Sequence, residues 1–265
     1  MQVQMVAFAT HKDGNGPDEW EDGVITGQDS SQSLARFIVL DGATEAYDVR
    51  RWVDQLSEAF MGLGSAKSGR VPRLDPKGMH TWFAAMQDRW LASAPASGDA
   101  IEREKLRRHG AFATMLGCEI SGLDGPSPVW NAVALGDTVL FHVRNDRLLS
   151  VFPKLGPGDF GTTPEVVHTM RASLERMDSR LAFDRGDLRS GDVMFAATDA
   201  LAHWIIASHA NRQAGLWRRL ATMWPTEFDE LIAAERQLGR MVNDDVTLLR
   251  VRLVAQRPSA VLICR

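Results

Sequence analysis

Acidic side chains recur at or next to the ends of apolar runs along this sequence. Asp41 follows FIVL, Asp137 follows AVALG, Asp199 follows VMFAAT, Asp244 stands just before DVTLLRVRL, and the pair Glu21 and Asp22 precedes the second strand-like run, in DEWEDG. Carboxylates that converge at strand ends cannot all remain ionised side by side unless cations lie between them. Ligand sets made only of oxygen favour Mg²⁺ or Mn²⁺ over zinc. If the fold gathers these residues, the pattern predicts a divalent-metal site.

Each of these acids has a simpler interpretation when it is taken alone. Aspartate before glycine, as in Asp41-Gly42, is common in turns, and aspartate also caps helices. One such acid is more often a turn former or a helix cap than a metal ligand. The metal hypothesis therefore depends on the whole set and on the elements that position it.

Apolar, β-branched runs predict the strands of this chain. They cover residues 3–10, 35–40, 111–120, 129–135, 139–144, 148–152, 193–198 and 246–254. Apolar residues at helical spacing predict helices over residues 49–60 and 79–90, and further helices are predicted over 164–177, 201–211 and 226–238. Strands in adjacent runs with paired helices between them indicate an α+β fold and not an alternating parallel one.

Length and composition limit the class of protein. With 265 residues, 45% of them hydrophobic, the chain can bury a full core, and its Gly-, Pro- and Ser-rich segments are short enough to be loops of a single domain over residues 1–265. The net charge of −4 offers no general attraction for nucleic acid or an anionic membrane. Cys118 and Cys264 are too few for a disulfide framework, and neither a signal peptide nor a membrane span is recognisable, so we expect a cytoplasmic protein.

The acids belong to short motifs whose order matches a known family. In chain order the motifs are EWEDG, FIVLDGATEA, HGAFATMLGCEI, NAVALGDTVLFHVRNDRL, SGDVMFAATDAL and NDDVTLLRVRL. Through them the chain resembles, over residues 5–253, the metal-dependent protein phosphatases of the PPM, or PP2C-like, family. No single motif is specific, but together and in this order they make a strong match.

The resemblance implies both a fold and an activity. The fold would be a four-layer α-β-β-α sandwich, in which two mostly antiparallel β-sheets are flanked by helices. The activity would be that of a protein serine/threonine phosphatase, which hydrolyses phosphoserine or phosphothreonine by attack of a water bridging two Mg²⁺ or Mn²⁺ ions. The implied partners are a phosphoprotein substrate and a cognate Ser/Thr kinase.

The resemblance also assigns a role to each acid. Asp41 corresponds to the carboxylate that bridges both metals, and the backbone carbonyl of Gly42 to a ligand of one of them. The remaining metal ligands would be Glu21, Asp22, Asp199 and Asp244, and the catalytic set would be Asp41, Asp199 and Asp244. Asp137 corresponds to a third metal position, where His203 stands in place of a second acid, so a third ion is expected to bind poorly.

The sequence departs from the family's pattern at several positions. Ala43 stands where the family often has a histidine, Ala200 where it has a glycine, and Pro17 where many members have an arginine that grips the phosphate. The candidates that remain for phosphate binding are Lys12, His11, Arg36 and Arg50, each of which is also explained as a surface side chain. The alternative function is therefore a catalytically weakened PPM-like module that binds or regulates a partner.

Overall fold

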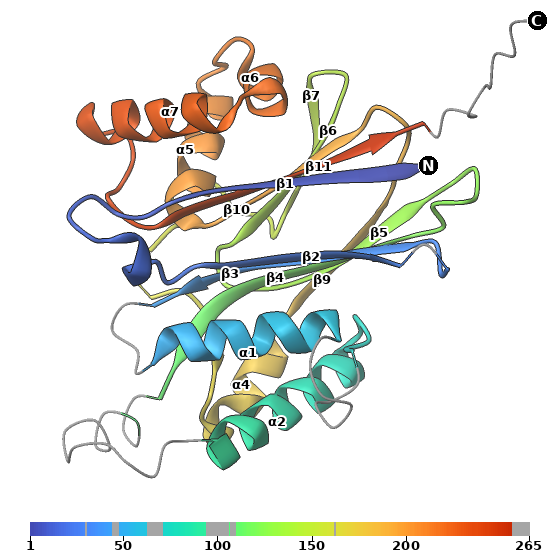
Figure 1. Cartoon of the computed structure of the whole chain (residues 1–265), viewed down its shortest axis with the longest axis vertical. Coiled ribbons are helices and arrows are strands. Elements are labelled where there is room, and N and C mark those ends of the chain that lie inside the picture. Colours follow the sequence, from blue (N-terminus) through green and yellow to red (C-terminus); the bar gives the residue numbers. More distant parts are fainter. Residues whose placement is uncertain are drawn as a thin grey trace, which may run out of the picture.

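The computed structural model describes residues 1–29, 31–43, 48–62, 71–93, 106, 110–161 and 163–255. Two antiparallel β-sheets are stacked face to face, and helices cover the outer face of each sheet (Figure 1). This arrangement confirms the expected α+β sandwich with layers in the order α-β-β-α. Within the described ranges, every helix is too short or too polar to span a bilayer.

The first sheet has the strand order β1-β11-β10-β6-β7, and each neighbouring pair is antiparallel. Its strands are β1 (Gln2–Thr10), β6 (Val139–Arg144), β7 (Arg147–Phe152), β10 (Val193–Ala197) and β11 (Val246–Val254). Its outer face is covered by α5 (Asp199–Ala210), α6 (Leu216–Thr222) and α7 (Pro225–Gln237) (Figure 1).

The second sheet has the order β2-β3-β4-β5-β9, and β8 pairs with β4 beyond this path. Its strands are β2 (Gly23–Asp29), β3 (Leu34–Gly42), β4 (Phe112–Ser121), β5 (Val129–Leu135), β8 (Val167–His168) and β9 (Ala182–Asp187). The helices α1 (Val49–Met61), α2 (Pro76–Ser93) and α4 (Leu174–Arg180) cover it, and two short 3-10 helices, η1 (Pro17–Glu19) and η2 (Arg171–Ser173), lie in connections.

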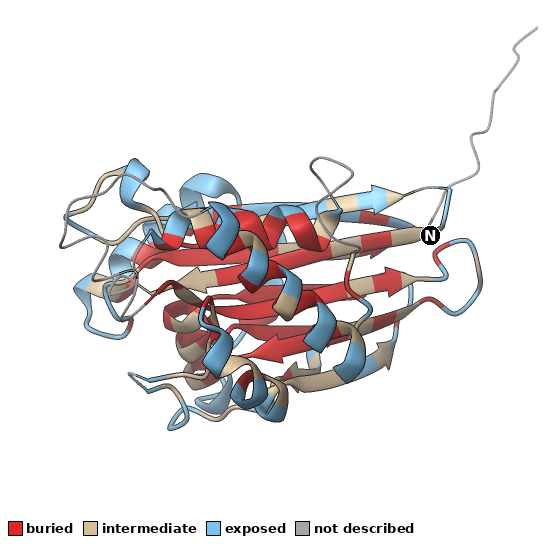
Figure 2. Cartoon of the chain, turned by 90° about the horizontal axis from the view of Figure 1, so that it is seen from below, coloured by how far each residue is buried: buried red, intermediate tan, exposed pale blue. Residues whose placement is uncertain are grey.

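Alternation along the strands divides the core into separate apolar layers. In β3, Phe37 and Val39 pack between the two sheets, whereas Ile38 and Leu40 face α1 and α2. All four side chains are fully buried, which explains why this strand reads as a continuous apolar run. Figure 2 shows the buried residues concentrated along the strands and on the inner faces of the helices. The apolar layers hold β3 rigidly, up to the point where Asp41 leaves the core.

The strand register brings distant segments to one end of the sandwich. In the second sheet, the start of β2 pairs with the end of β3, since Gly23 lies opposite Leu40. In the first sheet, Ala197 at the end of β10 lies opposite the early residues of β6 and β11. The short turn from β5 into β6 crosses between the sheets at this same end. All the loops that carry the predicted acids therefore meet there.

One predicted element was wrong and several were missed. The expected helix over residues 164–177 is replaced by β8, η2 and the start of α4. The side-chain amide of Gln87 donates to the carbonyl oxygens of His168 and Met170 at 2.9 and 3.0 Å, and Trp52 donates to that of Val167 at 3.0 Å, so α1 and α2 hold this segment extended. The sequence also did not predict β2, β9 or α6.

Candidate functional site

Asp41 is the last residue but one of β3 (Leu34–Gly42), at the end of the sandwich described above. Figure 1 labels this strand. Its Oδ2 atom accepts a long hydrogen bond, 3.5 Å, from the backbone N–H of Asp199, which belongs to the helical layer over the other sheet. Burial raises the pKa of Asp41 well above its usual range, and the charges of Asp22, Asp199 and Asp137 raise it further. Because these charges are all carboxylates, a cation placed among them would stabilise the ionised form of Asp41.

Asp22 is completely buried just before β2. Its Oδ2 atom accepts hydrogen bonds from the hydroxyls of Thr198, at 3.1 Å, and Thr247, at 2.7 Å, both in segments of the first sheet. Its Oδ1 atom is buried without a hydrogen-bond partner. Burial raises the pKa of Asp22, and the threonine hydrogen bonds offset only part of this increase. Asp22 therefore joins the two sheets and still has one unsatisfied oxygen.

Asp137 lies in the turn between β5 and β6, and only 5% of the residue is exposed. The turn requires Gly136, whose φ is +103° and whose missing Cβ would lie 2.6 Å from the carbonyl oxygen of Glu165. The Oδ1 atom of Asp137 is buried without a partner. Burial, followed by the charge of Asp199, raises the pKa of Asp137 to about 7.

Asp199 is the first residue of α5, immediately after β10 and the N-cap Thr198. The backbone N–H of Ala200 donates to its Oδ1 atom, and the positive end of the helix dipole favours a carboxylate at this position. Burial nevertheless raises the pKa of Asp199, and the charge of Asp244 adds to the increase. The helix terminus alone does not compensate the other acids.

Asp244 and Asp245 precede β11 and have different surroundings. Asp245 is 5% exposed, and its carboxylate accepts the backbone N–H groups of Lys12, at 2.9 Å, and Glu21, at 2.7 Å. Asp244 is half-buried, and its Oδ1 atom accepts the backbone N–H of Asp245 at 2.9 Å. Asp245 was not among the predicted site residues, because contacts across more than 200 residues of chain leave no local pattern.

Glu21, Gly42 and Val49 approach one another closely. A Cβ atom added to Gly42 would lie 2.5 Å from the carbonyl oxygen of Glu21 and 2.7 Å from Cγ2 of Val49. Glycine is therefore required at the end of β3 for the loop that carries Glu21 and the first turn of α1 to pack there.

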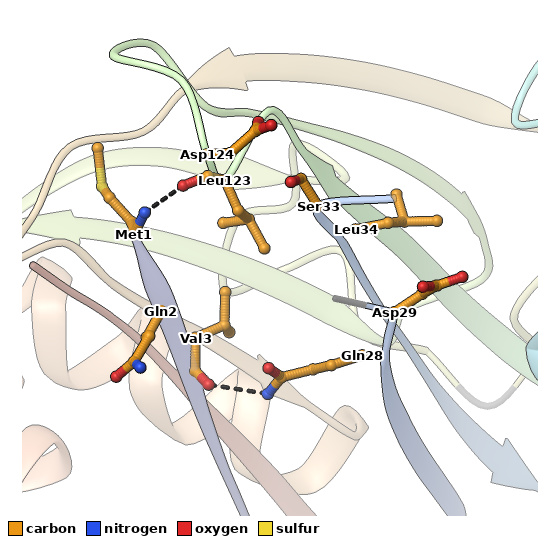
Figure 3. Close-up of a pocket in the computed structure, with 9 residues that line it drawn as sticks. All are labelled: Met1, Gln2, Val3, Gln28, Asp29, Ser33, Leu34, Leu123 and Asp124. Carbon is orange, nitrogen blue, oxygen red and sulfur yellow. Dashed lines mark hydrogen bonds between the residues drawn. The ribbon is translucent and has the colours of Figure 1, made fainter. Parts of the chain in front are cut away.

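The cavity in Figure 3 lies at the opposite end of the sandwich and is separate from these acids. It has a volume of about 250 Å³ and is lined by the first residues of β1 and β3, the last residues of β2 and the β4–β5 loop. Gln28 closes part of it by donating to the carbonyl oxygen of Val3 at 2.8 Å.

Solved structures resemble this fold over nearly its whole length. A bacterial serine phosphatase matches with a TM-score of 0.60 at 11% identity, covering 97% of this chain and 100% of that chain. The catalytic domain of the serine threonine protein phosphatase PstP, in complex with two manganese ions, matches with a TM-score of 0.58 at 14% identity, covering 96% and 99%. RsbX in complex with magnesium matches with a TM-score of 0.56 at 12% identity, covering 95% of each chain.

This chain has the fold of the PP2C-type phosphatases. No protein-family profile and no curated protein matches its sequence, so the likeness rests on structure. At identities of 11 to 14%, the likeness is one of fold.

We call the end of this PP2C-type fold that carries Asp22, Asp41, Asp137, Asp199 and Asp244 the acid end. The positively charged residues proposed for phosphate binding are placed differently relative to it. Arg36 lies within β3 and donates to Glu119 on β4 at 2.9 Å, which explains it as a cross-strand ion pair. Arg50, in the first turn of α1, donates to the carbonyl oxygens of Trp20 and Asp22 at 3.1 and 3.3 Å. Lys12 and His11 lie together on the loop after β1; the His11 ring makes a 3.1 Å contact with the Lys12 carbonyl oxygen, and the Lys12 N–H donates to Asp245.

Two of the positions that depart from the family's pattern have clear local roles. Pro17 begins η1, where its fixed φ suits the start of a helical turn. His203 lies one turn into α5, and its ring centroid is 5.3 Å from that of Phe160, so it packs against an aromatic side chain. Ala43 is followed by residues 44–47, which lie outside the described residues.

The acids fit a divalent-metal centre by their chemistry. Within the described ranges, no group of three or more His, Cys, Asp or Glu side chains is arranged to hold an ion as it stands. Asp22 and Asp137 each nevertheless have one buried carboxylate oxygen that accepts no hydrogen bond and could coordinate a cation. Together with the raised pKa of Asp41, they indicate negative charge that the surrounding protein leaves uncompensated.

Proposed function

We propose that this chain is a single-domain, metal-dependent phosphoprotein phosphatase that hydrolyses phosphoserine or phosphothreonine with two Mn²⁺ or Mg²⁺ ions. The observation that carries the proposal is the set of carboxylates at one end of a PP2C-type fold. Asp22 and Asp137 are buried, Asp41 and Asp199 are half-buried, and nearby carboxylates raise the pKa of each. Of the structures with this fold, the PstP catalytic domain is in complex with two manganese ions and RsbX is in complex with magnesium. Such a group of acids is costly without cations and is suited to binding them.

The ligand roles follow the positions of the acids. Asp41 would bridge the two ions; Gly42 (through its carbonyl oxygen), Glu21 and Asp22 would contribute to one side, Asp199 and Asp244 to the other, and Asp137 to a weaker third position. When bound, divalent ions supply activation of a water nucleophile and neutralisation of phosphate charge. Thr198 and Thr247 orient Asp22, and Asp245 fixes the backbone of Glu21.

Substrate binding must use groups other than the arginine that Pro17 replaces. We propose Lys12 and His11 as phosphate-binding residues, because Asp245 holds the backbone of Lys12 next to that of Glu21. Arg36 is withdrawn from this role by its ion pair with Glu119. The substrate would be a cytoplasmic phosphoprotein, and its cognate Ser/Thr kinase the natural regulatory partner.

The test is hydrolysis of an aryl phosphate and of phosphoserine and phosphothreonine peptides in the presence of MnCl₂ or MgCl₂. We expect turnover with either metal, no turnover after addition of a chelator, and no turnover by Asp41→Asn in any condition. The proposal would be contradicted if a chelator did not affect turnover. It would also be contradicted if no turnover occurred with either metal.

A second function is favoured by the departures around the site. The phosphate-gripping position is Pro17, inside η1, and the position after Asp199 is the buried Ala200. A catalytically weakened module would bind a phosphoprotein or a kinase without hydrolysis. Tight binding of a phosphopeptide by the wild type, without turnover in Mn²⁺ or Mg²⁺, would establish this alternative.

A further inference from the structure

Arg236, on the last turn of α7, connects two loops at the acid end of the molecule. Its guanidinium donates to the carbonyl oxygen of His11 at 3.1 Å, to Oδ1 of Asp13 at 3.0 Å and to the carbonyl oxygen of Asp244. The Arg236 side chain is only 6% exposed. Its two terminal nitrogens bind these three acceptors, whereas its Nε atom is buried without a hydrogen-bond partner.

The same two loops are joined by further hydrogen bonds that do not involve Arg236. The side-chain amide of Asn243 accepts the N–H of Asp13 at 2.7 Å and donates to the carbonyl oxygen of Asp13 at 3.1 Å. The carboxylate of Asp245 accepts the N–H of Lys12 at 2.9 Å. We call residues 11–13 and 243–245, joined in this way, the clasp.

We infer that Arg236 is a positioning residue for the cation site, acting through the clasp on Asp244 and on the neighbouring Glu21. This inference rests on the proposed function. Arg236 binds the main chain of Asp244 and leaves its carboxylate available, so it restricts where that carboxylate lies without neutralising it. Asp245 extends the effect, since it binds the N–H groups of both Lys12 and Glu21.

The planar guanidinium is needed because its donors point in fixed directions toward three acceptors. A lysine at this position would keep the positive charge near Asp13 but would not reach both loops with the same geometry. The charge itself is balanced locally by Asp13, whose side chain is 70% exposed. Geometry, more than charge, is therefore the contribution that we assign to Arg236.

Arg240 supplies a matched control on the same segment. Its guanidinium binds the carboxylate of Glu235 at 2.6 and 2.7 Å, and its side chain is 58% exposed. Within the described residues, none of its side-chain hydrogen bonds reaches the clasp. Glu235 would keep its hydrogen bond from Trp204 if Arg240 were replaced. Arg240→Met therefore makes the same change of residue type as Arg236→Met but should leave the two loops of the clasp in place.

The experiment measures Mn²⁺ binding by electron paramagnetic resonance of free Mn²⁺, with no substrate present, for the wild type, Arg236→Met, Arg236→Lys and Arg240→Met. Outer-shell partners of metal ligands usually contribute about 10- to 100-fold in metal affinity, so we expect a loss in this range for Arg236→Met. Arg236→Lys should recover part of the affinity, and Arg240→Met should bind like the wild type. Urea unfolding in chelator shows whether each variant is folded.

An affinity of Arg236→Met equal to that of the wild type would overturn the inference, and so would an equal loss in Arg240→Met. If Arg236→Met does not fold, Arg236→Lys decides: weakened binding supports the inference and unchanged binding overturns it. A wild type that does not bind Mn²⁺ overturns both this inference and the proposed function. A wild type that binds Mn²⁺ but hydrolyses no phosphopeptide contradicts the proposed function alone.

Discussion

An aspartate flanks each end of β10, Asp192 before it and Asp199 after it, and the surroundings of the two are opposite. Asp192, before the strand, has a fully buried side chain that accepts hydrogen bonds from Arg144, at 2.6 and 2.7 Å, and from His142, at 2.9 Å. Burial acts to raise the pKa of Asp192, but these hydrogen bonds outweigh it and lower the pKa. After the strand, burial raises the pKa of Asp199, and another acid, Asp244, raises it further.

Arginines are present at both ends, but their acceptors differ. Arg144 binds a buried carboxylate directly. At the acid end, Arg50 binds the carbonyl oxygens of Trp20 and Asp22, and Arg236 binds that of Asp244. The protein thus satisfies one buried acid with its own arginine and histidine, while at the other end it uses arginine to hold the main chain. The charge of the second group remains for a cation from solution.

Replacing Asp41 with Asn is expected to give the largest effect. The substitution removes one negative charge from the centre of the group and leaves an amide, which is a poorer ligand for Mn²⁺. Mn²⁺ binding by calorimetry and Mn²⁺-dependent hydrolysis should both fall below detection. Asp124→Asn, at the cavity of Figure 3, is the control and should behave like the wild type. Undiminished Mn²⁺ binding by Asp41→Asn would mean that the acids do not form one site.

The same substitution at the two ends of the sandwich should change stability with opposite sign. Asp192→Asn leaves the half-buried Arg144 and the buried His142 without their carboxylate, and removing the buried partner of such a pair costs about 3 kcal/mol. Asp41→Asn relieves repulsion among carboxylates and should raise the free energy of unfolding in chelator. Urea titrations of both variants in chelator measure the difference. Destabilisation by both substitutions would show that Asp41 already has a compensating partner.

The strands that hold the site were largely predictable because they are apolar on both faces. The structure has β5, β6 and β11 at the ranges predicted from the sequence. The sequence AFDRGD of β9 was not predicted because this edge strand is mostly half-exposed and polar. The predicted helix over residues 164–177 was wrong. The apolar residues there have helical spacing, but hydrogen bonds from Trp52 and Gln87 to β8 hold that part of the segment extended.

The acids could be proposed as a group from their positions at strand ends, but their support could not. Register decides which strand ends meet, and no local pattern specifies it across two sheets. Asp245 and Arg236 act through main-chain atoms of residues more than 200 positions away. Residues that bind carbonyl oxygens or N–H groups impose no residue type on their partners. Sequence alone therefore points to the carboxylates and not to the clasp.

The pH dependence of stability should also separate the two ends. Because the folded pKa of Asp137 is about 7 against an unfolded value of 3.8, the native state holds a proton that the unfolded state has released between these values. Stability in chelator should therefore fall by about 2 kcal/mol from this group as pH rises from about 5.5 to 8. Mn²⁺ should reverse the trend, since metal binding requires ionised carboxylates.

Urea midpoints measured across this pH range, with chelator or with MnCl₂, give the slope for each state. Asp137→Asn should show a smaller decrease with pH in chelator than the wild type. A stability in chelator that rises with pH over this range would show that groups such as His168, whose pKa burial lowers from 6.5, dominate over Asp137.

Arg50→Gln should give the smallest effect of this series. The Arg50 side chain is 48% exposed, so losing its hydrogen bonds to Trp20 and Asp22 should cost about 1 kcal/mol or less and should weaken Mn²⁺ binding only slightly. Arg51→Gln is the control for Mn²⁺ affinity, because the Arg51 guanidinium packs over the Trp90 ring, 4.0 Å from its centroid. Urea midpoints and Mn²⁺ affinity measure both variants.

The kinetics of Arg50→Gln then test the comparison itself. If Arg50 only holds the main chain beside Glu21, the KM for a phosphopeptide should remain unchanged at saturating Mn²⁺. If KM rises while Mn²⁺ affinity and stability stay the same, Arg50 binds the substrate phosphate. Arg50, from α1, would then replace the phosphate-binding arginine whose position Pro17 occupies. An arginine at the acid end would then serve an anion after all, as Arg144 does at the other end, with the anion brought by the substrate.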